Sequence, residues 1–322
     1  MKDMPGLTFI FTNSHDVTTD LLVSRIGGGR IFRFNFDLWR DYWIVLTPGG
    51  FEIGNPAGLR VTDRDVVKYY WRKPMRLQQM DPWAEVEDRV HYIEEELWYI
   101  MREILNLCWL RGQVVLVEPF ADSRCGKIVQ ALAAGRYFNV PPFRCVMGAP
   151  DALRAGRRSV VKSLSSTRLD KTSVFYSTEV EEGGLDPSVP WQIQDLVDAE
   201  KDVTIVAVGD QMFAFELARQ PFADRTLDWR EVATDYVTDQ WQVHPLPAAI
   251  EHAAVSLMRD LRLGYGRMDL LLDRQGAYHF LEVNPNGEWG WLDAAGTHGL
   301  LNRIIEEISP DTPVNPIPMV RS

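Results

Sequence analysis

The residues best placed to do chemistry lie between Gly264 and Asn286, where two short apolar runs flank a polar turn. Asp269 interrupts the first run, and Glu282 and Asn284 interrupt the second. Side chains alternate between the two faces of a strand, so Glu282 and Asn284 point the same way. If the runs pair so that Asp269 lies beside Glu282, three oxygen ligands converge. Mg²⁺ prefers a few carboxylate oxygens and completes its shell with water and phosphate oxygens, so this stretch predicts a magnesium site.

A β-hairpin is the element that would bring these three side chains together. The apolar runs are 268–272 and 278–283, and the Asp-Arg-Gln-Gly segment at 273–276 separates them. Two apolar runs joined by a short segment that contains glycine are typical of a hairpin. We therefore expect strands on both sides of residues 273–276.

The rest of the chain alternates between strand and helix patterns. A strand, a helix and a second strand at 8–12, 17–26 and 31–36 indicate a βαβ beginning. Three glycines at 27–29 follow that helix, and glycine is favoured just past a helix C-terminus, so they predict a helix-ending turn in preference to a phosphate loop. An apolar stripe at spacings of three and four predicts a helix from Asp81 to Leu107, capped by Asp81 and Pro82. Further strands are expected at 43–46, 51–53, 66–71, 114–117, 159–164, 174–177, 191–197, 203–208 and 212–217, and further helices at 123–138, 245–261 and 300–308.

Composition narrows the class of protein. With 322 residues and 46% hydrophobic content, the chain can bury a large core divided into two or three lobes. It contains no apolar run of about 18 residues, so no transmembrane helix and no membrane partner are expected. The net charge of −11 argues against a nucleic-acid partner. Three cysteines fit neither a disulfide framework nor a zinc pattern, and the N-terminus lacks a signal-peptide layout, which together indicate a cytoplasmic protein with reduced thiols.

A single lysine and a cluster of basic residues are candidates for binding acidic partners. Lys162 lies inside an apolar strand, where lysine seldom occurs unless its charge is paired. The alternative is a lysine that reaches the surface from an edge strand. A basic cluster of Arg72, Lys73 and Arg76 follows the strand at 66–71. It could bind an acidic peptide or a phosphate, or it could be a solvated loop.

These motifs occur in an order that resembles a known family. Lys127, Lys162, the Gln-Asp-Leu-Val segment 194–197, and Asp269 with the Glu-Val-Asn segment 282–284 resemble the ATP-grasp superfamily of carboxylate ligases. Further motifs look like those of the microviridin-type peptide ligases, also called graspetide macrocyclases. They are Trp-Arg-Lys-Pro at 71–74, the helix carrying Arg124, Lys127 and Gln130, Asp-Trp-Arg at 228–230, and Glu-Val-Asn-Pro-Asn-Gly-Glu-Trp-Gly-Trp-Leu at 282–292. The ordered set covers nearly the whole chain.

The resemblance implies an α/β (α+β) fold of the ATP-grasp type with three lobes. Residues 1–120 would form an N-terminal pre-ATP-grasp lobe that recognises peptide. Residues 121–195 would form the central lobe, and residues 196–322 the C-terminal lobe with the magnesium site. ATP and Mg²⁺ are the implied cofactors.

The resemblance also implies a role for each matching residue. The phosphates of ATP would contact Lys127 and Lys162. Adenine would lie at Gln194, Asp195, Leu196 and Val197, with Glu200 or Asp202 near the ribose. The magnesium ligands would be Asp269, Glu282 and Asn284. Arg219 and Arg267 would steady the γ-phosphate or an acyl phosphate, although an ordinary surface role remains an alternative for both. Substrate contacts would come from Arg72, Lys73, Arg76 and Arg230, whereas Trp289 and Trp291 either contribute to the site or pack against the final helix.

The implied activity is ATP-dependent ligation of a carboxylate through an acyl phosphate. The substrate would be a ribosomal precursor peptide, with leader and core, whose side chains become crosslinked by ester or amide bonds. One alternative is an ATP-grasp ligase that joins an amino acid or small amine to a carboxylate, and another is a non-catalytic peptide-binding protein with the same fold. Thr204 occupies a position at which many of these peptide ligases carry arginine, so one expected cation is missing. A homodimer is compatible with the resemblance.

Overall fold

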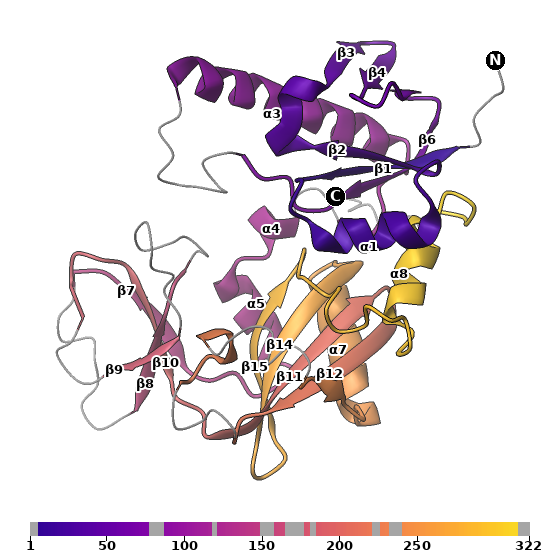
Figure 1. Cartoon of the computed structure of the whole chain (residues 1–322). Helices are drawn as coiled ribbons and strands as arrows, with labels where there is room; N and C mark the ends of the chain where they lie inside the picture. The colour runs from indigo at the N-terminus through magenta and orange to yellow at the C-terminus, as the bar shows by residue number, and fades with distance from the viewer. Residues whose placement is uncertain are drawn as a thin grey trace.

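The computed structural model describes residues 6–76, 87–117, 121–148, 158–164, 177–180, 185–220, 226–231 and 240–314. Its elements form three groups along the chain, which Figure 1 shows as an upper lobe, a lower left lobe and a lower right lobe. The groups follow the three predicted segments in order: the boundary at 195/196 falls between two strands, and the boundary at 120/121 falls at the start of a short helix. The division into functional domains stays a prediction.

The N-terminal group is built on a parallel sheet. Strands β1 (Leu7–Thr12), β2 (Ile31–Asn35) and β6 (Val66–Trp71) pair in the order β2-β1-β6. Helix α1 (Val17–Ile26) begins after Asp16, whose carboxylate accepts hydrogen bonds from two backbone N–H groups of the first turn, and ends at Gly27 with φ of 103°. The predicted βαβ beginning and the predicted helix-ending glycine turn are therefore confirmed.

Further elements complete this group. An antiparallel sheet contains β3 (Trp43–Thr47), β4 (Gly50–Gly54) and β5 (Arg60–Thr62), after the short helix η1 (Phe36–Asp41). Helix α3 (Asp88–Leu110) packs against β6, while the predicted start of this helix at Asp81 lies outside the described residues. The strand predicted at 114–117 is wrong: these residues are buried, but only Val114 forms a bridge, to Tyr69.

The central group contains two short helices and an antiparallel sheet. Helices α4 (Ala121–Arg124) and α5 (Lys127–Ala134) replace the one helix predicted at 123–138, because Gly126 adopts an extended conformation with ψ of 158°. The sheet has the order β7-β10-β8-β9, with β7 (Phe143–Val146), β8 (Ser159–Lys162), β9 (Thr178–Val180) and β10 (Trp191–Asp195). Most of the strand predicted at 174–177 lies outside the described residues.

The C-terminal group is a five-stranded antiparallel sheet of order β13-β12-β11-β14-β15. Its strands are β11 (Ala199–Val208), β12 (Gln211–Ala218), β13 (Gln242–Val243), β14 (Tyr265–Asp273) and β15 (Tyr278–Asn284). Helix α7 (Ala248–Asp260) and α5 cover one face, where Val203, Ile205 and Ala207 are buried. Side chains alternate along a strand, so Asp202, Thr204 and Val206 face the other side. The short helix η3 (Trp229–Glu231) lies over that side.

The last helix joins the first and third groups. Helix α8 (Leu300–Ile308) packs against α1 and β6 of the N-terminal group and against β11 (Figure 1). The buried cation Lys68 of β6 caps its end by donating to the carbonyl oxygen of Glu307 at 2.7 Å. None of the helices in the described ranges is both long and apolar enough to cross a membrane.

Candidate active site

The predicted hairpin forms, and its register brings the predicted metal ligands together. Asp269 of β14 lies directly opposite Glu282 of β15, and Arg267 lies opposite Asn284. The turn uses Gly276 at φ of 82°, a left-handed conformation that glycine adopts without strain. The pairing on which the magnesium hypothesis depended is thus confirmed.

A β-bulge puts the acidic residues on the correct face. The register shifts between Asp269 and Leu270, so that Leu281 has no direct partner on β14. Phe280 and Val283 both point into the core beneath the sheet, although they are three residues apart. The extra residue therefore reverses which side chains of β15 face the core, so that Glu282 and Asn284 lie on the open face of the sheet and line the cavity.

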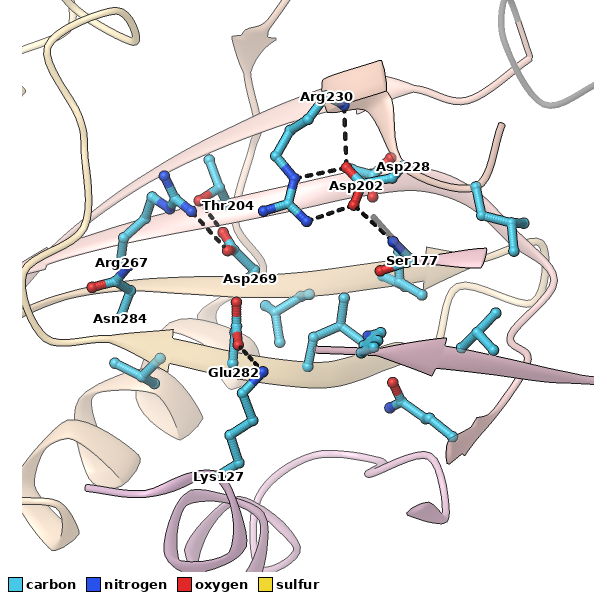
Figure 2. A pocket seen from close by; sticks show the side chains of 18 of the residues that line it. Lys127, Ser177, Asp202, Thr204, Asp228, Arg230, Arg267, Asp269, Glu282 and Asn284 are labelled. Carbon is cyan, nitrogen blue, oxygen red and sulfur yellow. Dashed lines mark hydrogen bonds and ion pairs between the residues drawn. The ribbon is translucent and has the colours of Figure 1, made fainter. Parts of the chain in front are cut away.

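Thr204 completes one row of polar side chains across three strands. It lies opposite Asp269 on β11, and its hydroxyl donates to Asp269 Oδ1 at 2.9 Å. Arg267 Nη2 lies 3.0 Å from the other oxygen, Oδ2 (Figure 2). At this position the chain thus has a short hydroxyl donor, which fixes the orientation of the Asp269 carboxylate.

Helix α5 supplies a cation and anchors the strand that carries Glu282. Lys127 Nζ lies 3.1 Å from Glu282 Oε2 (Figure 2). One turn on, the Gln130 amide donates to the carbonyl oxygen of Val283 at 2.8 Å and accepts from its N–H at 2.8 Å. Burial opposes ionisation of Glu282, but the charges of Lys127 and Lys162 hold its pKa below the ordinary value. Glu282 is therefore a carboxylate at neutral pH.

A cavity of about 500 Å³ separates the central and C-terminal sheets and is lined by both. Lys162 faces it from β8, and burial lowers the pKa of this lysine to about 8. The whole predicted adenine segment 194–197 lines the cavity at the crossing from one sheet to the other. Of the two acidic residues considered for the ribose, Asp202 lies in the cavity, whereas Glu200 is exposed outside it.

Two Asp–Arg pairs and an aromatic wall close one side of the cavity. Arg219 Nη1 lies 3.6 Å from Asp202 Oδ1, and Arg230 forms hydrogen bonds with Asp228 (Figure 2). Burial raises the pKa of Asp202 to about 6, against the opposing charge of Arg219. The wall consists of Trp229, Trp241 and Trp291, whose ring centroids lie 5.3 to 5.6 Å apart. Arg219, Arg230 and Arg267 thus all line the cavity, as does Trp291.

The basic cluster of Arg72, Lys73 and Arg76 after β6 does not line the cavity. Arg72 has an exposed fraction of 0% and contacts the segment that follows β15, which speaks against the peptide-binding role predicted for it. Lys73 pairs with Glu288 at 2.9 Å, and Arg76 pairs with Glu95. A peptide contact by Lys73 or Arg76 stays a prediction. Trp289, unlike Trp291, is fully buried and packs in the core next to the last helix.

The donor set fits the ligands that the sequence predicts. Within the described residues, no three His, Cys, Asp or Glu side chains gather as a metal cluster, so a cation here would need the amide oxygen of Asn284 besides two carboxylates. Mg²⁺ suits such an incomplete oxygen set, because waters and phosphate oxygens can fill the remaining positions. Four buried atoms of cavity-lining residues have no hydrogen-bond partner in the described part of the chain: Gln192 Oε1, Asp202 Oδ2, Trp241 Nε1 and Arg267 Nε. Buried polar atoms of this kind are normally satisfied, which fits a polar ligand in the cavity.

Sequence reasoning missed three features of the site. Gln130 belongs to a motif that the sequence analysis names, but its hydrogen bonds to Val283 of β15 were not predicted, because an amide three residues after Lys127 fits an ordinary exposed helix face equally well. Trp241 lies in a polar segment without periodicity, so nothing placed it at the cavity. The bulge at Leu281 could have been inferred from Phe280 and Val283, two apolar residues whose spacing of three breaks the alternation of a strand.

Comparison with known proteins gives structural relatives only. No protein-family model matches the chain, and no curated protein matches it. The solved structure of a RiPP-associated ATP-grasp ligase from Chryseobacterium gregarium, in complex with ADP and a leader and core peptide, is 20% identical and superposes with a TM-score of 0.77, covering 97% of this chain and 98% of that one. The macrocyclase MdnC from Microcystis aeruginosa, bound with the precursor peptide MdnA, is 23% identical with a TM-score of 0.77, covering 94% and 99%.

A further solved structure shows how widely the fold is shared. The D-alanine–D-alanine ligase from Bacillus anthracis, complexed with ATP, is 12% identical with a TM-score of 0.51, covering 94% of this chain and 96% of that one. Similarity at these identities establishes architecture. From β1 to α8, this chain has the ATP-grasp fold.

Proposed function

We propose that the protein is an ATP-dependent carboxylate ligase that crosslinks side chains of a ribosomal precursor peptide. The observation that carries the proposal is the row of Thr204, Asp269 and Glu282 on the floor of a cavity that Lys127 and Lys162 face from the central lobe. Opposed lysines and carboxylates between two sheets suit a nucleoside triphosphate with a divalent cation.

Each part of the cavity suits one part of the nucleotide. Residues 194–197 offer backbone groups to adenine, and Asp202 suits the ribose hydroxyls. Lys127 and Lys162 would offset phosphate charge, and this neutralisation supplies much of the catalysis in phosphoryl transfer. Asp269, Glu282 and Asn284 would hold Mg²⁺, which when bound neutralises phosphate oxygens. Arg267, already beside Asp269, is positioned to steady the transferred phosphoryl group.

The reaction follows from placing a carboxylate next to that phosphoryl group. A carboxylate oxygen of the substrate attacks the γ-phosphorus of ATP, the bond to the β-phosphate oxygen breaks, and ADP leaves. The resulting acyl phosphate is attacked at its carbon by a hydroxyl or an amine, which loses its proton as phosphate departs. Arg219 and Arg230 lie on the same cavity, so they can reduce the repulsion between an anionic substrate and the phosphates.

The assignment of a peptide as the substrate is supported by the structural relatives. Among the solved structures with the same fold over nearly the whole chain, the ATP-grasp ligase holds a leader and core peptide, and the macrocyclase MdnC holds a precursor peptide. In this chain Arg230 is an exposed cation at the cavity, and the tryptophan wall beside it offers apolar surface for a peptide. We place Asp or Glu side chains of the core as the activated groups, and Ser, Thr or Lys side chains as the acceptors.

Intact mass is the measurement that tests this function. The protein should be incubated with ATP, Mg²⁺ and the peptides encoded by short reading frames beside its gene. The expected product is a peptide lighter by one water for each linkage, formed with one ADP per linkage. ADP formation with free amino acids but not with peptides would favour the small-substrate ligase, and peptide binding without ADP formation would favour a non-catalytic protein.

Lys162 gives a pH-dependent prediction for nucleotide binding. Its pKa in the free protein is lowered to about 8 by burial, and phosphate charge favours the protonated form. Nucleotide binding must therefore raise this pKa and take up a proton above about pH 8. The affinity for Mg²⁺–ADP should be constant below about pH 8 and fall by up to about tenfold per pH unit above it, as measured by calorimetric titration.

The matched variant is Lys162→Arg, which stays charged over this range. Its affinity should show no step at about pH 8, whatever its absolute value. A wild-type profile that runs parallel to that of the arginine variant would show that Lys162 does not titrate against the phosphates.

A further inference from the structure

Two sequence motifs more than two hundred residues apart bind each other in the interior. Arg72, at the end of β6, donates to the side-chain oxygen of Asn286 at 3.0 Å and to its carbonyl oxygen at 3.2 Å. Asn286 in turn donates to the carbonyl oxygen of Arg72 at 3.1 Å. The guanidinium also contacts Glu288, and its Nε lies 3.7 Å from Asp16 Oδ2. This contact joins the N-terminal lobe to the segment directly after β15.

The same segment fixes the predicted metal ligand. The N–H of Asn286 donates to Asn284 Oδ1 at 3.1 Å, which leaves one lone pair of that oxygen for a cation. The carbonyl oxygen of Glu288 accepts from Arg267 Nη1 at 3.2 Å, and the carbonyl oxygen of Gly287 accepts from the Tyr265 hydroxyl at 2.7 Å. One short stretch therefore orients both Asn284 and Arg267.

Close packing makes this stretch rigid. A Cβ atom on Gly287 would lie 2.5 Å from Arg267 Cβ, so the backbone runs directly against the arginine side chain. Arg72 has an exposed fraction of 0%, and the Lys73 ammonium and the Thr18 hydroxyl hold the carboxylate of Glu288 from the N-terminal side. A shift of 286–288 would thus move side chains on the floor of the cavity.

We propose that Arg72 is a positioning residue: through Asn286 it holds Asn284 and Arg267 in the geometry needed for Mg²⁺ and the nucleotide phosphates. The N-terminal lobe, which supplies no described residue to the cavity lining, thereby acts on nucleotide binding in the C-terminal lobe. Outer-shell partners of this kind commonly affect metal affinity about 10- to 100-fold. The inference rests on the proposed function, because it assumes that nucleotide and Mg²⁺ bind here.

Lys68 provides a matched control on the same strand. It too is fully buried and joins β6 to the C-terminal lobe, but its ammonium contacts the carbonyl oxygen of Glu307 and the Thr312 hydroxyl at the end of α8. Lys68→Met therefore removes a buried interlobe cation without touching the segment at 286–288. Arg72→Met removes the buried interlobe cation that contacts this segment.

The experiment measures ADP affinity by calorimetry over a range of Mg²⁺ concentrations, at a temperature where thermal unfolding shows each variant to be folded. Arg72→Met should weaken the Mg²⁺-dependent part of ADP affinity about 10- to 100-fold. Arg72→Lys should restore little of it, because lysine lacks the fork with which Nη1 of Arg72 contacts Asn286 while Nη2 contacts Glu288. Lys68→Met should bind as the wild type does. If Arg72→Met does not fold, Asn286→Ala, which leaves every buried charge paired, should show the same loss.

Three results would count against these assignments. Equal affinity in the wild type and in Arg72→Met, or in Asn286→Ala where Arg72→Met does not fold, would overturn the inference. An equal loss in Lys68→Met would also overturn it, since any loosening of the lobes would then suffice. A wild-type protein that binds no ADP with or without Mg²⁺ would overturn the proposed function on which the inference depends.

Discussion

Replacement of Asp269 by Asn, or of Glu282 by Gln, should leave a folded protein that forms almost no ADP. Both substitutions keep the size of the side chain but remove the charge that a cation requires. The loss is larger at Asp269, because Thr204 donates to one of its oxygens and Arg267 to the other, and the amide NH2 of asparagine would face one of these donors. Loss of one preorganised electrostatic contact commonly costs about 10²- to 10³-fold in rate. ADP release, measured with the peptide identified by mass, checks the effect.

Asp273→Asn is the control for this prediction. Asp273 ends the same strand and accepts hydrogen bonds from the N–H groups of Gln275 and Ala277 in the turn, but it does not line the cavity. Asparagine can accept the same bonds, so the rate should stay near that of the wild type. Wild-type turnover in Asp269→Asn or Glu282→Gln would contradict the assignment of these residues to Mg²⁺.

The sequence predicted the floor of the site because its signals are local. Asp269, Glu282 and Asn284 belong to one hairpin, and the turn at 273–276 sets the pairing as far as Leu270 opposite Phe280. The bulge at Leu281 then brings Asp269 opposite Glu282. Lys162 was recognisable for a similar reason: a lysine within an apolar strand needs a specific explanation, which its position facing the cavity supplies. Strand periodicity and turn chemistry are readable without knowledge of the rest of the fold.

The role of Arg72 was not predictable, because it depends on contacts across the whole chain. An arginine after a strand, followed by lysine and proline, looks like part of a basic surface. Only the packing of the N-terminal lobe on the segment after β15 buries it against Asn286 and Glu288. The strand predicted at 114–117 failed for a related reason: an apolar run records burial, and burial alone does not distinguish a strand from a buried loop.

Trp289 lies where the lobes meet. Its exposed fraction is 0%, and its cluster draws side chains from elements that are far apart in sequence. The members include Ile10 of β1, Leu22 of α1, Tyr70 of β6, Val206 of β11, and Leu300 and Ile304 of α8. The indole therefore fills the interior of the contact between the N-terminal and C-terminal lobes, to which Arg72 and Lys68 also contribute.

Trp289→Ala should lower the free energy of unfolding by about 3–5 kcal/mol, because a buried tryptophan replaced by alanine loses its transfer free energy and leaves a cavity. Denaturant unfolding, followed by circular dichroism, measures the change. Trp291→Ala is the comparison: Trp291 is half-buried at the cavity, where it contacts Trp229 and Trp241, so the loss of stability should be much smaller. If both variants unfolded at the same denaturant concentration as the wild type, the indole of Trp289 would not stabilise the contact between the lobes. The packing of α8 on β6 would then be what stabilises it.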